Sequence, residues 1–140
     1  MNYEKIQKSS LRFSVNFTRY IFKPNRDNKI RILLNQLLRA GTSVGANLEE
    51  ADSAASRKDF IHKISISKKE ARETKYWLEL ISQSGLIINQ KDKQDLDALL
   101  KEIDEIERII GAIHYKTKYG CAKPCLPAGE HTTIGHCGIE

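Results

Sequence analysis

Basic side chains at helical spacing are the residues of this chain best suited to a chemical role. At about 100° per residue, one narrow sector of a helix collects Lys5, Lys8, Arg12, Arg19 and Lys23. A second stripe, at spacings of four and three, consists of Lys68, Arg72 and Lys75. Such stripes neutralise phosphates and release counterions. Both predict binding to RNA or DNA, and a solvated charged face without a ligand is the alternative for each.

The overall charge agrees with a polyanionic partner. The formal net charge is +5 at pH 7 and the pI is about 9.1. From residue 1 to residue 31 there are eight Lys or Arg against two acids, Glu4 and Asp27. The positive charge is therefore concentrated near the start of the chain, where a polyanion would be attracted most strongly.

Catalytic chemistry has little support. The sequence contains no HExxH, no glycine-rich phosphate loop and no GxSxG, so we expect a protein that is not an enzyme and needs no cofactor. His62 and His114 are isolated and fit structural positions. Glu49, Glu50 and Asp52 fit a solvated acidic end, because neighbouring helical residues point about 100° apart and do not converge on one metal ion.

The last part of the chain differs from the rest. Residues 119–140 have no helical period and contain two of the three prolines, so we expect a flexible tail. All three cysteines lie in it, and they cannot form a disulfide framework for the body. Its possible metal ligands match zinc spacings only loosely, which leaves a zinc site as the alternative to a metal-free tail. They are Cys121, Cys125, His131, His136 and Cys137.

A polar stripe borders an apolar face between Gln36 and Asn47. The apolar face contains Leu33, Leu37, Ala40, Val44 and Ala51. If the chain turns near Ala54 and Ala55, Arg39 faces Glu70 and Ser43 faces Ser67. We therefore expect a hydrogen-bonded polar layer, with Lys63 at its edge, because a buried Arg needs a partner. The layer consists of Gln36, Arg39, Ser43, Asn47, Ser67 and Glu70, and a catalytic pocket is the less favoured alternative.

Helical periodicity predicts four helices. They cover residues 3–22, 26–52, a segment from Ser56 to Gly85, and residues 91–118. Short links between the later helices favour antiparallel neighbours. The predicted fold is therefore all-α, an antiparallel up-down-up-down four-helix bundle over residues 1–118. Gly41 and Gly45 are costly inside a helix and indicate that another backbone passes close by.

The first predicted helix carries more apolar surface than one bundle can bury. Ile6, Phe13, Phe17 and Tyr20 form one face, and a second strip lies on another side. A large exposed apolar patch marks a contact surface, so we expect a homo-oligomer. The predicted interface residues are Leu11, Val15, Phe22, Ile66 and Trp77.

The predicted cellular location depends on two kinds of segment that the sequence lacks. No run approaches the roughly 20 apolar residues that span a bilayer, and the first residues lack the apolar run of a secretory signal. We therefore expect a cytoplasmic protein that does not bind membranes.

Two stretches carry a family resemblance, Gln36 to Ala51 and Asp59 to Ile87. They resemble the four-helix bundle proteins encoded in 23S rRNA intervening sequences, over roughly residues 3–118. The resemblance depends on Gln36, Arg39, Ala40, Ser43, Asn47, Glu49, Phe60, Ser67, Glu70, Leu78 and Gly85. Ala51 stands where members usually carry Gly, and the cysteine-containing tail has no counterpart.

The resemblance implies a small bundle that assembles as a homopentamer and whose function is unassigned in most members. The family is also similar in architecture to the accessory variability determinant proteins of diversity-generating retroelements, which are basic pentamers. By that analogy the partners would be nucleic acid and a reverse transcriptase. A protein-interaction scaffold that never contacts nucleic acid, with its charge serving solubility, is the alternative function.

Overall fold

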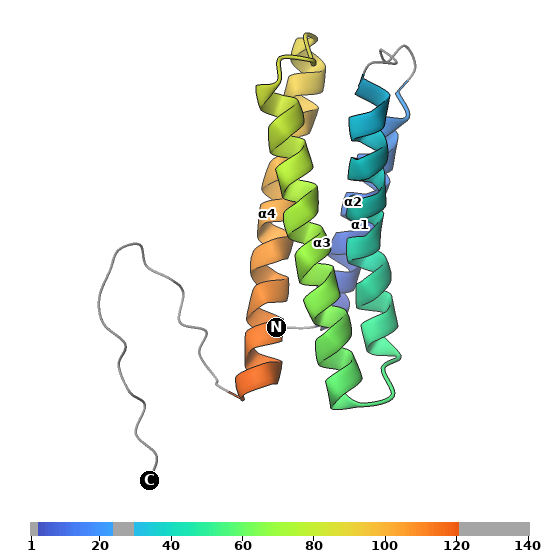
Figure 1. Cartoon of the computed structure of the whole chain (residues 1–140), viewed down its shortest axis with the longest axis vertical. Helices are drawn as coiled ribbons and strands as arrows, with labels where there is room; N and C mark the ends of the chain where they lie inside the picture. The colour runs from blue at the N-terminus through green and yellow to red at the C-terminus, as the bar shows by residue number, and fades with distance from the viewer. Residues whose placement is uncertain (1–2, 24–29, 121–140) are drawn as a thin grey trace, which may run out of the picture.

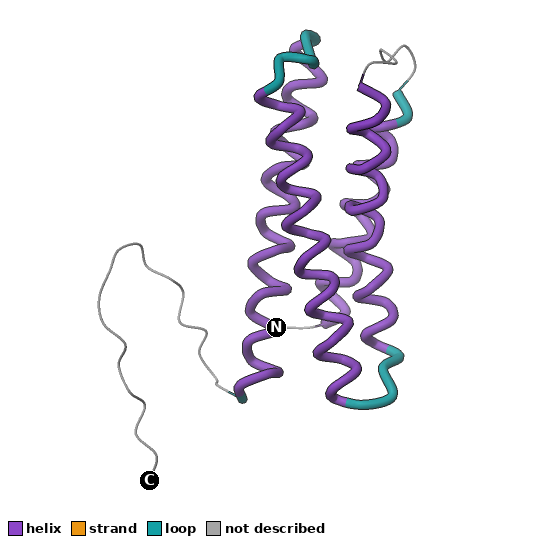
Figure 2. Tube along the Cα trace, viewed as in Figure 1, coloured by secondary structure: helices purple, strands orange, loops and turns teal. Residues whose placement is uncertain are grey.

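The computed structural model describes residues 3–23 and 30–120, which form four helices (Figure 1). They are α1 (Tyr3–Ile21), α2 (Arg31–Asp52), α3 (Arg57–Gln83) and α4 (Gln90–Tyr119). The described residues contain no β-strand, and short loops join α2 to α3 and α3 to α4 (Figure 2). The predicted all-α class and four-helix bundle are confirmed. The predicted tail lies outside the described residues from residue 121 onward, and Tyr119 proves to be the last residue of α4.

Each helix packs against two others. α2 and α4 both contact α1 and α3, whereas α2 and α4 lie at opposite corners of the bundle. Consecutive helices run in opposite directions in Figure 1. Ion pairs between α3 and α4 agree with an antiparallel arrangement of these two helices. Arg72 pairs with Glu107, and Lys75, one turn later on α3, pairs with Asp104, one turn earlier on α4.

The bundle axis is filled by one apolar face from each helix. On α1 the predicted face is buried, and Ser10 and Ile21 extend it. On α2 Leu34 and Leu48 are buried, while Leu33 is only half-buried. The inward face of α2 is therefore rotated slightly from the predicted one. The largest fully buried side chains are Phe13, Phe17, Ile6, Leu37, Leu48, Ile64, Leu78, Ile81, Leu96, Ile103, Ile110 and Val44.

Side-chain caps fix where α3 and α4 begin. Ser56 Oγ accepts a hydrogen bond from the Asp59 backbone N–H at 3.1 Å, and the Asp59 carboxylate accepts one from Ala55 N–H at 3.2 Å. Asn89 Oδ1 accepts from the backbone N–H of Lys91 at 2.8 Å. These bonds satisfy amides that have no partner inside the helix.

Hydrogen bonding also holds the first turn of α1 to the bundle. The Tyr3 hydroxyl donates to the Leu48 carbonyl oxygen at 2.6 Å. Burial is the main cause that raises the pKa of Tyr3 to about 12, and the negative charges of Asp52 and Glu49 contribute less. The hydroxyl therefore remains a donor throughout the physiological pH range.

The atoms nearest to the two glycines of α2 are side-chain atoms of α1. A Cβ at Gly41 would lie 2.6 Å from Phe17 Cε1, so the space is filled by an aromatic ring. At Gly45 the nearest atoms are the hydroxyls of Ser10 and Ser14, at 3.5 and 3.6 Å. Close packing of α1 on α2 therefore depends on a ring at one glycine and on small side chains at the other.

No described helix combines the length and the apolar character needed to cross a membrane.

Gly41→Ala and Gly45→Ala are expected to change stability in opposite directions. Alanine at 41 collides with the buried Phe17 ring and should lower the free energy of unfolding by about 1–3 kcal/mol. Alanine at 45 makes ordinary contacts and should raise it by up to about 1 kcal/mol, through better helix propensity. Urea unfolding followed by circular dichroism measures both, and equal effects of the two substitutions would contradict the assigned packing.

Candidate nucleic-acid and subunit interfaces

The basic sector of α1 is exposed along most of its length. Lys5, Arg12 and Arg19 form no ion pair with any residue in the described ranges, and Lys8 pairs only with Glu4 of its own helix, at 2.5 Å. An exposed pair at this spacing contributes little to stability. Four of the five predicted cations of α1 therefore remain accessible to an external anion.

Lys23, the fifth cation, is bound within the protomer. Its Nζ lies 2.5 Å from Asp92 Oδ1 and 2.6 Å from Asp95 Oδ2. Hydrogen bonds to these two carboxylates raise the pKa of Lys23, and the bond to Asp92 has the larger effect. Two acids against one cation leave this end of α1 without excess positive charge, so a phosphate contact at Lys23 is not what this geometry favours.

The predicted stripe of α3 is also largely neutralised. Arg72 Nε lies 3.1 Å from Glu107 Oε1, and Lys75 Nζ lies 2.5 Å from Asp104 Oδ1. The hydrogen bond from Lys75 lowers the pKa of Asp104 and keeps it ionised. Of the three predicted cations, Lys68 alone forms no ion pair with the described residues. The stripe lies along α3 as predicted, but its own spacing does not take into account the acids that α4 places opposite it.

Grooves between α1 and α4 carry both signs of charge. One, with a volume of about 270 Å³, includes Arg19, Asp95 and Glu102 in its wall. A smaller one, of about 140 Å³, is lined by Lys5, Ser9, Arg12, Glu102, Glu105, Ile106 and Ile109. Because acids face the cations across the grooves, the positive potential inside them is reduced.

The second apolar strip of α1 is exposed within the protomer. Relative exposure is 63% for Leu11, 40% for Val15 and 67% for Phe22. Spaced at four and seven residues, they share one side of the helix. Ile66 is half-buried, and Trp77 packs against the core and donates its indole N–H to Glu73 at 3.2 Å. The strip on α1 thus offers a second copy more surface than the two α3 residues do.

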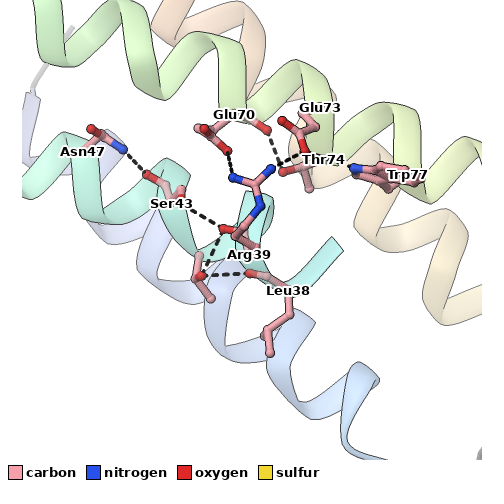
Figure 3. A network of polar contacts seen from close by, with 9 residues as sticks. Leu38, Arg39, Ser43, Asn47, Glu70, Glu73, Thr74 and Trp77 are labelled. Atoms are coloured by element: carbon pink, nitrogen blue, oxygen red, sulfur yellow. Dashed lines mark hydrogen bonds and ion pairs between the residues drawn. The ribbon is translucent and has the colours of Figure 1, made fainter. Parts of the chain in front are cut away.

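The polar stripe of α2 forms a different network from the predicted layer (Figure 3). Arg39 Nη2 lies 2.5 Å from Glu73 Oε1, whereas its nearest approach to Glu70 is 3.9 Å. The principal partner is therefore one turn beyond the predicted one. Figure 3 shows Arg39 reaching across from α2 to both carboxylates of α3.

Serine and asparagine in this stripe bond to the backbone. Ser43 donates to the Arg39 carbonyl and Asn47 to the Ser43 carbonyl, each at 2.8 Å. Ser67 is fully buried and donates to the Val44 carbonyl, not to Ser43 as predicted. Ser43 and Asn47 reach the carbonyl four residues back more readily than a side chain on the next helix. Gln36 is exposed, and Lys63 pairs with Glu50.

The described ranges contain no candidate metal-binding cluster. No three His, Cys, Asp or Glu side chains gather there in a way that could hold a metal ion. The predicted zinc alternative concerned Cys121 to Cys137, which lie outside those ranges. His62 is exposed, and His114 is half-buried near Lys68 and Lys118.

The acids of α4 are the residues that sequence reasoning missed. Asp104 and Glu107 lie three residues apart, opposite two cations that lie three residues apart on α3. Once α3 and α4 are taken as antiparallel neighbours, this matched spacing could have been recognised from the sequence. The ion pairs would then have been predicted in place of a nucleic-acid contact.

Comparison with known proteins places the chain in a family. A family model described as 23S rRNA-intervening sequence protein matches residues 4–112. The chain is also similar to a crystal structure from Bacteroides thetaiotaomicron, described as a protein with unknown function from the S23 ribosomal protein family. The two share 35% sequence identity with a TM-score of 0.68, over 81% of this chain and 98% of the other. No curated protein matches.

Lys68→Gln is expected to raise the pKa of His114. Burial lowers this pKa below its ordinary value of 6.5, and the charges of Lys68 and Lys118 lower it further. Because the folded pKa lies below the unfolded one, His114 costs stability as the pH falls below about 6.5. NMR titration of the histidine ring measures the shift, and Lys69→Gln, one residue along, serves as the control. An unchanged His114 pKa in Lys68→Gln would contradict the electrostatic assignment.

Proposed function

Because the chain belongs to the 23S rRNA-intervening sequence protein family, we propose that it is a non-enzymatic, ring-forming protein whose basic surface binds RNA or other nucleic acid. The ring would contain five copies, as the resemblance implies. The family description names an RNA context and no reaction. The proposal also retains the expected cytoplasmic location, where cellular RNA is accessible.

One observation carries the proposal: on α1, cations without acidic partners lie next to an apolar strip. Leu11 and Arg12 are consecutive, so their side chains point about 100° apart and serve different surfaces. Burying the strip against another copy would remove apolar area from water without covering the cations. Each added copy would bring another set of phosphate contacts to the same assembly.

Nucleic-acid contact is assigned to the cations without interhelical partners. These are Lys5, Lys8, Arg12, Arg19 and Lys68. Lys23, Arg72 and Lys75 are given a structural role, because their charge is already compensated by α4. A reverse transcriptase partner, suggested only by architectural analogy, is not part of this proposal.

Arg12→Gln with Arg19→Gln should weaken binding to a fluorescent single-stranded RNA at low salt by about tenfold. Loss of two phosphate contacts should reduce the slope of log Kd against log salt by about 1.4. The comparison variant, Arg72→Gln with Lys75→Gln, loses the same formal charge but should weaken binding less. Fluorescence anisotropy from low to high salt measures both. Absence of salt-sensitive binding by the wild type would instead support the protein-interaction scaffold.

Leu11→Asp with Val15→Asp should convert an oligomer to monomer without loss of helicity. Both side chains are exposed within the protomer, so two charges there oppose association more than folding. Ile88→Asp alters an apolar residue that is 87% exposed in the loop before α4 and should leave association unchanged. Analytical ultracentrifugation at micromolar concentration is the measurement. A monomeric wild type would contradict the ring.

A further inference from the structure

Positive charge without acidic partners is also found at the C-terminal end of α4. From Gln90 to Glu107 this helix carries seven Asp or Glu, and from Arg108 to Tyr119 it carries none. The second part contains Arg108, Lys116 and Lys118. None of these three forms an ion pair with the described part of the chain. The half of α4 that neutralises its neighbours is thus followed by a half that cannot.

Cations from both neighbouring helices border this half of α4. Ile109 lines a groove together with Lys5 and Arg12 of α1, and Glu102 and Glu105 of α4 line the same groove. Two residues later, a Cβ at Gly111 would lie 4.0 Å from Lys68 Cε of α3. Residues 109–111 of α4 therefore lie between cations of α1 and a cation of α3, about one turn before Tyr115.

A hydrogen bond attaches α3 to the last turn of α4. Arg57 Nη2 donates to the Thr117 carbonyl oxygen at 2.6 Å. This bond joins the start of α3 to the end of α4, at the end of the bundle shown lowest in Figure 1. The acidic residues at this end of the bundle belong mainly to α2, and the diagonal packing keeps α2 away from α4. Glu50 there is already paired with Lys63.

Two exposed tyrosines lie within this positive region. Tyr115 and Tyr119 are 37% and 58% exposed, with ring centroids 5.0 Å apart and planes at 46°. Lys118 Nζ lies 5.2 Å from the centroid of the Tyr119 ring. Neither ring belongs to the core cluster. Adjacent aromatic faces among lysines suit stacking with unpaired bases, because every base has a π-face and the phosphates need cations.

We propose that Tyr115 and Tyr119, with Lys68, Lys116 and Lys118, form a binding site for an unpaired nucleic-acid strand. Bases stack on the two rings and the lysines contact the phosphates on either side. A duplex fits poorly, because its bases are already stacked and not available to the rings. This inference rests on the proposed nucleic-acid binding and assigns it a second site and a strand preference.

The test compares single strands with a duplex, using the full chain. Fluorescence anisotropy at low salt measures affinity for a labelled oligo(U) RNA, an oligo(dT) DNA and a duplex of equal length. In Tyr115→Leu with Tyr119→Leu, affinity for both single strands should fall by about tenfold or more, and affinity for the duplex should be unchanged. Tyr115→Phe with Tyr119→Phe should bind as the wild type does, because the rings are retained.

Tyr76→Leu is the matched control. Tyr76 is 57% exposed, lies on α3 and packs edge-on against Trp77, with centroids 5.2 Å apart. Its substitution should leave single-strand affinity unchanged. Circular dichroism verifies that all variants are folded.

The possible failures can be told apart. A wild type that binds none of the three nucleic acids overturns both the proposed function and this site. A wild type that binds, with the Leu variant equally tight, overturns this site alone. Equal losses for single strands and duplex also overturn it, because stacking would then not be the source of the affinity.

Discussion

Four helices packed around one axis can each turn only about a third of their circumference inward, and this constraint determines what the surface of the protein carries. α2, α3 and α4 bury one apolar face each. α1 buries its Phe13 and Phe17 face but has a second strip that finds no room at the axis. The Phe17 ring fills the space above Gly41, so α1 cannot rotate to hide the strip without losing that contact.

Charge is distributed by a second constraint, the pairing of neighbouring helices. α4 places its acids against cations of α1 and α3, which fixes Lys23, Arg72 and Lys75 within the protomer. These ion pairs are partly exposed, so each contributes little to stability. Their larger effect is to decide which cations remain available: those of α1 other than Lys23, and those around the end of α4. The net charge of the chain therefore says less about its surface than the register of the helices does.

Periodicity was enough to predict four helices, because it is a local property of the sequence. The predicted face of Ile6, Phe13, Phe17 and Tyr20 is buried, as the periodicity indicated. The partners of the charged residues could not be obtained in this way. A change of register by a single turn replaces Glu70 with Glu73 opposite Arg39. The pair of tyrosines on α4 was missed because their spacing is also that of ordinary helix surface, and only the arrangement of cations around them distinguishes the two.

The positions of these surfaces make assembly and binding compatible. Arg12 and Arg19 line the two grooves between α1 and α4, whereas Leu11 and Val15 line neither groove. A second copy on the strip would therefore leave the cations of α1 and the end of α4 uncovered. The proposed site of two exposed tyrosines and a few lysines would bind one strand weakly, but several such sites on the proposed oligomer would act at high effective concentration. Assembly would then convert a modest contact in each protomer into an appreciable affinity. The apolar strip would strengthen binding at the basic surface in this way, because burying it is what brings the copies together.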